Sequence, residues 1–428
     1  MYLADSRTAP DTAAGRDARP GRRIGAVPGT VLALGTVSLI TDVSSEMVTA
    51  VLPLYLVAGL GLSPLGFGLL DGVYNGVSAL VRLVGGRLSD RRGSGHKAVA
   101  VAGYGLSALC KPLLLVTHSV PLIGAVLAAD RTGKGLRTAP RDALISLASE
   151  PATRGRAFGV HRAMDTAGAL LGPLVAFLIL RVAADGYDAV FTTSGCVAVL
   201  GVLVLLLFVP GRSPSPGGRE TSGSVDDRVP LRVLLRRPAV RRLTGCAVLL
   251  GLTTVSDSFL YLTLQRRLDL PESWFPLLPL GTACAFLLLA VPLGAVADRV
   301  GRRRLFLCGH LALLGAYGLL VAPLGAASGS SAPACLVLLL HGTFYAATDG
   351  VLAAATADAV PEAVRGSGLA VVQTGQAAAR FLCSIAFGAA WTAWGDRTAL
   401  GTAAAGLAVS AALSALLLRT PPPPEPVR

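Results

Sequence analysis

Long apolar segments alternate with short polar ones along almost the whole chain. Twelve of these segments approach or exceed ~20 residues, the length of helix that crosses a bilayer. In the first half the predicted helices cover residues 30–58, 63–86, 98–117, 120–148, 155–181 and 188–210. In the second half they cover residues 239–265, 272–297, 304–325, 331–360, 364–391 and 397–419. The pattern predicts an all-α membrane protein with twelve transmembrane helices.

The polar segments divide this chain into two halves. Residues 211–238 are rich in Ser, Pro, Gly and Arg and predict a linker between six-helix halves at 30–210 and 239–419. Residues 1–29 lack an apolar core and predict a disordered tail, not a cleavable signal. Residues 420–428 include four consecutive prolines, which cannot continue a helix, and predict a second tail.

The distribution of charge indicates the orientation of the helices. Hydrophobic residues make up 53% of the 428 residues and charged residues only 15%. Of the 38 Lys and Arg, 26 fall in the two tails and in alternate loops, and short basic loops stay in the cytoplasm. We therefore expect cytoplasmic termini and a cytoplasmic linker. The net charge of +13 then reflects topology and not a nucleic-acid partner.

The cysteines and histidines do not suggest a metal site. All seven Cys lie in apolar stretches without a Cys-x-x-Cys pair, which is typical of small packing residues. The five His show no pairing at metal-ligand spacing. We expect no metal and no cofactor.

One polar turn, Gly-x-x-x-Asp-Arg-x-Gly, occurs in both halves, and its two aspartates are 208 residues apart. It resembles the signature turn between the second and third helices of each half in the major facilitator superfamily. The resemblance extends from about residue 30 to 419 and implies the major facilitator fold, with two pseudo-symmetric six-helix halves. It also implies a bacterial, drug/proton antiporter-like protein of the inner (plasma) membrane. The residues of the two turns are Gly86, Asp90, Arg91 and Gly93, and Gly294, Asp298, Arg299, Gly301 and Arg302.

In the superfamily this turn helps to latch one half against the other, and the resemblance implies the same role here. The two copies are unequal. The basic residue expected four places after the Asp is present as Arg302, but the first copy has Ser94. The second turn is therefore the more complete latch.

The predicted fourth helix carries six charged residues. At roughly 100° per residue they fall within an arc of about 140°, a face that must line protein or water because lipid would not solvate it. Arg131-x-x-Lys134-Gly135 resembles the Arg-x-x-Gln-Gly motif of superfamily antiporters. Arg131 is expected near mid-membrane. Lys134, Arg137 and Arg141 either act in transport or only neutralise nearby acids.

The predicted fifth helix contains Gly159, Gly168, Gly172 and Pro173. This spacing is similar to the antiporter motif of superfamily exporters, although Ala176 and Phe177 replace its last two glycines. Small residues four apart permit close helix contact, and a proline loosens the backbone. The motif favours export over import.

Acids within the spans are the candidates for proton coupling, because a carboxyl in low dielectric can be loaded with a proton and released by an approaching cation. Bases are about as numerous as acids in the spans, so many must form structural pairs, for example Arg162 with Asp165. By family resemblance the first, fourth, seventh and tenth helices line a central cavity. The candidate coupling and cavity residues are Asp42, Glu46, Arg131, Lys134, Arg137, Asp165, Asp257, Asp349 and Arg380.

These features favour a monomeric secondary transporter that exports a small molecule, a drug or natural product, by proton antiport and alternating access. Its expected partners are the bilayer, the solute and protons. The alternative is a proton-coupled importer of an anionic metabolite or sugar derivative, suggested by the basic face of the fourth helix. A membrane-embedded enzyme is disfavoured because Gly-x-Ser-x-Gly, His-Glu-x-x-His and P-loop patterns are missing. A transporter-like sensor would need a cytoplasmic module, which this sequence does not encode.

Overall fold

The structure is a computed structural model of the chain. It describes residues 27–91, 96–117, 119–150, 154–183, 186–210, 238–322, 332–348, 352, 356 and 365–418. The predicted tails and linker fall almost wholly outside these residues.

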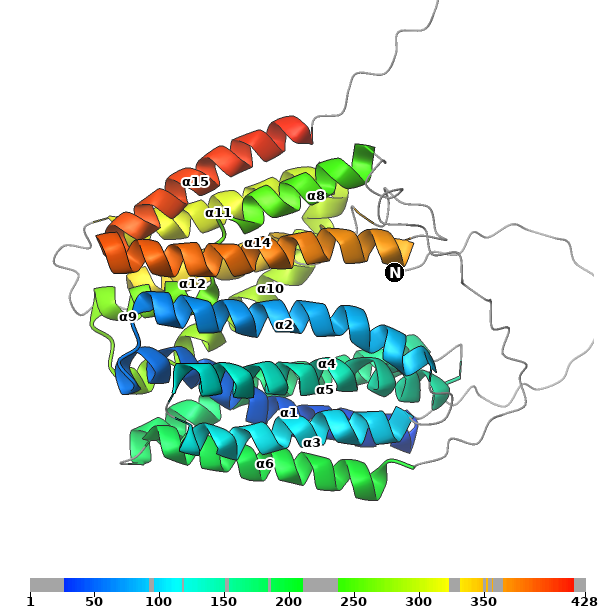
Figure 1. Cartoon of the computed structure of the whole chain (residues 1–428). Helices are drawn as coiled ribbons and strands as arrows, with labels where there is room; N and C mark the ends of the chain where they lie inside the picture. The colour runs from blue at the N-terminus through cyan, green and yellow to red at the C-terminus, as the bar shows by residue number, and fades with distance from the viewer. Residues whose placement is uncertain are drawn as a thin grey trace, which may run out of the picture.

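The first half of the described chain is a bundle of six helices, drawn from blue to green in Figure 1. The first helix, α1, ends in a π-helical turn, η1, at Tyr55–Gly59. The six helices are α1 (Gly29–Leu54), α2 (Pro64–Arg91), α3 (His96–Val116), α4 (Val120–Leu147), α5 (Arg154–Val182) and α6 (Gly186–Phe208).

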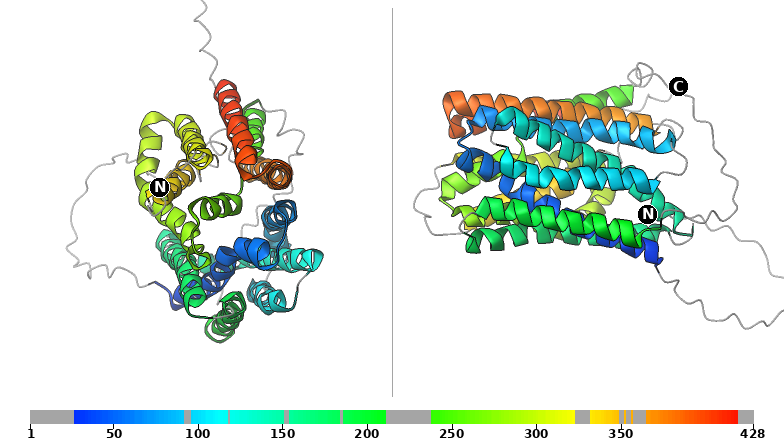
Figure 2. Two further views of the ribbon diagram at one scale, coloured as in Figure 1. Left: turned by 90° about the vertical axis from the view of Figure 1, so that its left-hand side faces the viewer. Right: turned by 60° about the horizontal axis from the view of Figure 1, so that its bottom comes forward.

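The second half supplies six more spans from its described residues, and one of them is interrupted. The end-on view in Figure 2 shows the two halves as two groups of helices side by side. The elements are α8 (Pro238–Gly251), α9 (Asp257–Leu268), the short η2 (Glu272–Trp274), α10 (Leu277–Val300), α11 (Arg302–Val321), α12 (Ala332–Thr348), α14 (Arg365–Trp394) and α15 (Asp396–Leu417). The all-α, twelve-span, two-half prediction is confirmed.

The prediction of one continuous helix over 239–265 was wrong. The chain leaves helical geometry between Gly251 and Asp257, so α8 and α9 are two halves of one span. The Thr254 hydroxyl bonds back to the Leu250 carbonyl at 2.7 Å, and the freed Val255 N–H donates to the buried Tyr317 hydroxyl at 2.8 Å. A break inside a membrane is tolerated only where such partners satisfy the backbone.

The other predicted bounds agree with the structure to within a few residues, except for 331–360. The helix described there is Ala332–Thr348, and most of the remaining stretch lies outside the described residues.

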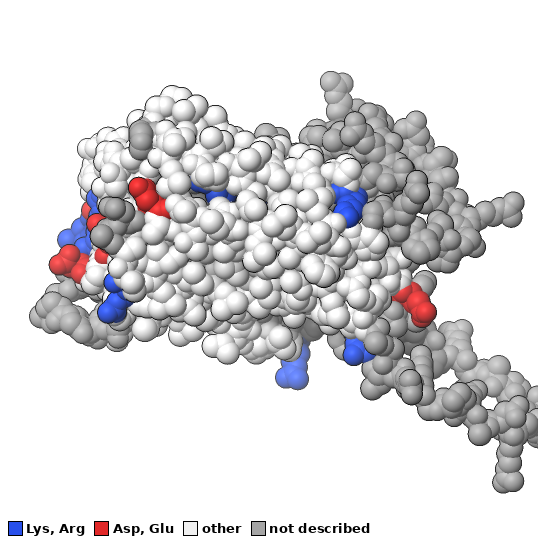
Figure 3. All heavy atoms as spheres, turned by 90° about the horizontal axis from the view of Figure 1, so that it is seen from below, with Lys and Arg blue, Asp and Glu red and all other residues white. Residues whose placement is uncertain are grey.

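The long helices differ in hydropathy. Among the described residues, seven helices are long and apolar enough to cross a membrane. Helices α2, α4 and α14 are not among them, since they carry polar and charged residues inward. Figure 3 shows one face of the bundle on which most visible Lys, Arg, Asp and Glu lie toward the two ends. The surface between the two ends carries few charged side chains in this view, as expected of a surface that contacts lipid.

The two halves meet most closely where α2 packs along α14. A Cβ at Gly68 would lie 2.5 Å from the Ser384 carbonyl oxygen, so only glycine allows this approach. Toward the end of the bundle that carries η2, Phe67 stacks edge-on to Phe259 at 4.9 Å, and the Tyr187 hydroxyl donates to Glu272 at 2.9 Å. These contacts join the halves at the η2 end.

Candidate functional site

A cavity of about 920 Å³ lies between the two halves. Its wall is built by α1, α2 and α4 of the first half, and by the break before α9, with α10, α12 and α14, of the second. Aromatic rings and small apolar side chains form much of the surface. Its charged lining residues are Glu46, Asp71, Arg131, Asp257 and Arg380.

The charged face of α4 points into the protein, as its spacing predicts. Arg137 is buried and its Nη2 lies 3.1 Å from Asp42 Oδ1. Lys134 Nζ lies 3.3 Å from Glu46 Oε1 and 4.0 Å from Asp42 Oδ1. The two acids of α1 are therefore held by two cations of α4, and Glu46 also faces the cavity.

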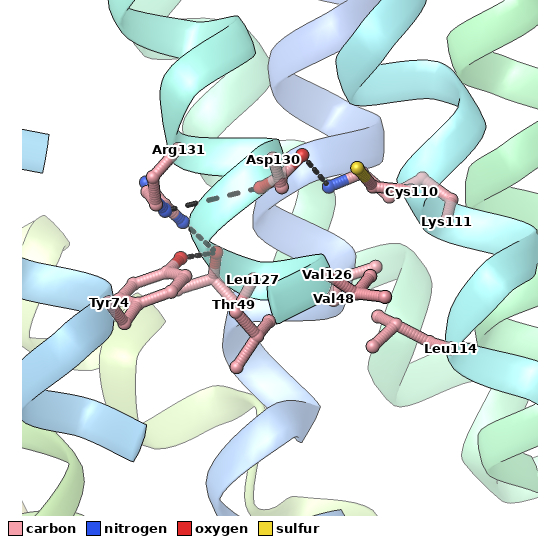
Figure 4. Close-up of a pocket in the computed structure, with 10 residues that line it drawn as sticks. All are labelled: Val48, Thr49, Tyr74, Cys110, Lys111, Leu114, Val126, Leu127, Asp130 and Arg131. Atoms are coloured by element: carbon pink, nitrogen blue, oxygen red, sulfur yellow. Dashed lines mark hydrogen bonds and ion pairs between the residues drawn. The ribbon is translucent and has the colours of Figure 1, made fainter. Parts of the chain in front are cut away.

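Arg131 is placed differently from the other cations of α4. Its guanidinium lies over the Tyr74 ring, 3.5 Å from the centroid, and Nη2 donates to the Thr49 hydroxyl at 3.4 Å (Figure 4). Its Nε is 4.0 Å from Asp130 Oδ2, too far for a hydrogen bond, and has no other partner. Asp130 itself is engaged at 2.9 Å by Lys111. Arg131 thus has one donor, the enclosed Nε, that no described group engages by a hydrogen bond.

A further ion pair joins α4 to α5. Arg141 Nη1 lies 3.6 Å from Asp165 Oδ1, and Arg141 also pairs with its neighbour Asp142 at 3.0 Å. The predicted partner of Asp165, Arg162, is instead exposed. That prediction was wrong because it considered only neighbours on one helix, whereas the packed α4 supplies the closer cation.

The glycines of α5 explain how α1 comes so close. A Cβ at Gly168 would lie 2.5 Å from the Leu39 carbonyl oxygen, and one at Gly172 would lie 2.7 Å from the Glu46 Cβ. Gly159, in contrast, faces open space, and Pro173 lies inside the helix. Two glycines of the motif therefore set the position of the α1 acids.

In the second half, the break in the helix presents Asp257 at the first turn of α9. Its two carboxylate oxygens accept hydrogen bonds from the Tyr345 hydroxyl at 2.6 and 2.7 Å, and His341 Nε2 lies 3.3 Å from Oδ1. Arg380 lines the same cavity from α14. The fifth predicted acid, Asp349, lies outside the described residues.

Sequence reasoning did not single out several residues that line or support the cavity. The buried Asp71 of α2 accepts a hydrogen bond from Ser384 of α14 at 2.7 Å and so joins the halves. Tyr74 lies three residues further along the same helix. His341 and Tyr345, four apart on α12, could have been noticed as polar aromatic residues on one helical face. Their proximity to Asp257 depends on tertiary packing.

The two latch turns are only partly described. Gly86 lies in α2 and Gly294 in α10, while Gly93 and the side chains of Asp90, Arg91, Asp298 and Arg302 lie outside the described residues. Gly301 takes φ +100° between α10 and α11, a backbone conformation that suits glycine. Arg299 is exposed. The latch role stays a prediction.

Comparison with known proteins identifies the family. The model of the Major Facilitator Superfamily matches residues 34–288 and 277–428, which together make up most of the chain. The chain belongs to the Major Facilitator Superfamily. It is a multi-pass membrane protein of the transporter fold.

The similar proteins in this family are diverse. An uncharacterised transporter of the superfamily from Methanocaldococcus jannaschii is 29% identical over 351 residues, 80% of this chain and 84% of that protein. Multidrug resistance protein MdtH of Photorhabdus laumondii is 28% identical over 38% of this chain and 40% of its own length. The crystal structure of the nucleoside transporter NupG superposes with a TM-score of 0.74, covering 92% of this chain and all of NupG at 13% identity. That likeness concerns the fold alone.

Proposed function

We propose that this member of the superfamily is a secondary transporter that exports a small molecule in exchange for protons. The observation that carries the proposal is the pairing of Glu46 with Lys134 at 3.3 Å on the cavity wall. It places a carboxylate that can take up a proton beside the space that a solute would occupy.

The inter-half contacts support alternating access. With both termini in the cytoplasm, the η2 end of the bundle faces outward, and there the halves are joined by Phe67, Phe259 and the Tyr187–Glu272 hydrogen bond. The structure then corresponds to a carrier closed on its outer side. Opening outward requires these contacts to separate while the halves rock around the cavity.

Proton coupling uses the α1–α4 ion pairs. A proton that enters from outside neutralises Glu46 and releases Lys134, whose charge is then balanced less well inside the membrane. Return of the proton to the cytoplasm restores the pair. Asp42, held by Arg137 at 3.1 Å, lies one helical turn away and shares Lys134 at 4.0 Å. The two acids form one coupled proton site.

Export is favoured by α5, whose glycines fix α1 against it and whose spacing is similar to that of exporters of the superfamily. The partial similarity to a multidrug resistance protein agrees with this direction. Import of an anionic solute is the second candidate, suggested by the basic face of α4, from which Arg131 lines the cavity. We place the protein in a bacterial inner membrane, as a monomer.

The proposal is tested in inside-out membrane vesicles that hold an imposed proton gradient, acid inside. Solutes that cause proton efflux, measured with a pH-sensitive dye, are transported by antiport, and radiolabelled forms of them should accumulate. Vesicles with Glu46→Gln should show neither effect. Accumulation that continues unchanged after the gradient is collapsed would show that transport is not coupled to protons.

A further inference from the structure

The charged groups of the cavity differ in how far the protein itself engages them. All three acids are held by neighbours. Glu46 pairs with Lys134 at 3.3 Å, and Asp71 accepts from Ser384 at 2.7 Å. Asp257 accepts two hydrogen bonds from Tyr345, and His341 lies 3.3 Å away. Each acid of the cavity therefore already has at least one partner within the protein.

Each of the two arginines that line the cavity has one nitrogen, Nε, without a hydrogen-bond partner among the described residues. The Nε atoms of both Arg131 and Arg380 are buried and have no hydrogen-bond partner. Arg131 is only 9% exposed, and its guanidinium is fixed in place by the Tyr74 ring and the Thr49 hydroxyl. Within the part of the chain that the structure describes, Arg380 makes neither an ion pair nor a hydrogen bond. Buried donors without partners are rare, because each forfeits the hydrogen bonds it made in water.

The two arginines come from opposite halves, α4 and α14, and line one cavity. A planar guanidinium is a fork of donors that matches a carboxylate or phosphate group, and the bond is strong because both partners are charged. Around the arginines, the wall includes the rings of Tyr261, Phe275 and Phe286. This combination supplies a charged anchor and an apolar surface for the rest of a ligand.

We infer that the transported solute is an organic anion, with a carboxylate or phosphate group bound between Arg131 and Arg380 and an apolar or aromatic body on the cavity rings. The inference rests on the proposed transport function and names its substrate class. An anion that engages both arginines links the two halves directly. Both arginines already line the cavity in this structure, so the anion would hold α4 and α14 together while it is bound.

The test measures the thermal stability of the purified full-length protein in detergent with four aromatic probes. Two are anions, benzoate and phenyl phosphate. Two are controls of similar size, neutral benzamide and cationic benzylamine. At millimolar concentration at least one anion should raise the unfolding temperature, and the two controls should not. A larger effect of one anion tells whether carboxylate or phosphate is preferred.

Variants show whether the two arginines are responsible. Arg380→Gln and Arg131→Gln should each weaken the apparent affinity for the anion by about tenfold or more, since each removes a charged donor. Arg380→Lys keeps the charge but loses the fork and should weaken binding less. Arg241→Gln is the matched control, because Arg241 is exposed on α8 and lies outside the cavity. Size-exclusion profiles check that each variant is folded.

Three results would overturn the inference: no shift with either anion, equal shifts with the neutral or cationic probe, or full anion binding by Arg380→Gln. This binding assay needs no proton gradient. Anion binding without coupled transport would leave the inference standing and refute antiport. Coupled transport of neutral or cationic solutes would refute the inference and leave antiport standing.

Discussion

Arg137 Nη2 lies 3.1 Å from Asp42 Oδ1, and both side chains are buried between α1 and α4. Each residue needs the other there, because a buried charge without its partner lowers stability far more than the intact pair does. We therefore expect the pair to contribute both to stability and to transport, and substitutions can separate these two roles.

Asp42→Asn should lower stability by about 3–5 kcal/mol, since it leaves Arg137 buried without its carboxylate. The double variant Asp42→Asn with Arg137→Gln should recover much of that loss, as it removes both charges. Proton-driven transport should remain absent in both variants. Thermal unfolding in detergent and vesicle transport measure the two effects. Full transport by the single variant would assign the pair a purely structural role or none.

Glu46→Gln should behave differently, because the Glu46 side chain is 26% exposed and faces the cavity. Its loss should change stability little, by about 1 kcal/mol or less for a partly solvated ion pair. Proton-driven accumulation should be lost, whereas exchange of labelled for unlabelled solute should persist. Loss of exchange together with accumulation would place Glu46 in solute binding and not in proton coupling.

Gly172→Ala should destabilise the first half, because a Cβ there would lie 2.7 Å from Glu46 Cβ and 2.9 Å from the Met47 amide nitrogen. Separating the two helices should cost about 1–3 kcal/mol and shift the α1 acids. Gly159→Ala is the matched control on the same helix, since nothing lies within 4 Å of its added methyl. Similar unfolding temperatures for the two variants would contradict the close-contact role of Gly172.

Much of this architecture could be predicted from the sequence, because twelve apolar spans and a repeated polar turn are properties of local sequence. The inward face of α4 also followed from spacing alone. The partners of individual polar groups could not be predicted, because they come from other helices. The break between Gly251 and Asp257 carries no glycine or proline within it, and it depends on Tyr317 of α11 to receive the Val255 N–H. Likewise Asp165 pairs with Arg141 because α4 and α5 pack together.

Tyr317→Phe tests the break directly. The buried hydroxyl accepts the Val255 N–H at 2.8 Å, and its removal leaves a backbone donor unsatisfied at a cost of about 1–3 kcal/mol. Because Asp257 follows two residues later, its contact with Tyr345 should also be disturbed. We expect a lower unfolding temperature and slower transport. Tyr345→Phe, which removes a hydroxyl at the acid itself, should slow transport without weakening the break.

The hydrogen bond from Tyr187 to Glu272, at 2.9 Å, crosses between the halves at the η2 end. In a carrier that alternates between two forms, a contact made in only one of them sets their populations. Tyr187→Phe should therefore shift the protein toward the outward-open form by about tenfold, the effect of one hydrogen bond to a charged group. A cysteine introduced by Ser256→Cys at the cavity wall would report this shift, through faster labelling by an impermeant thiol reagent added outside right-side-out vesicles. Protein without the Ser256→Cys change corrects for the native cysteines. Unchanged labelling would mean that other contacts between the halves, such as those of Phe67 with Phe259 and of Phe177 with Trp274, hold the η2 end closed without this hydrogen bond.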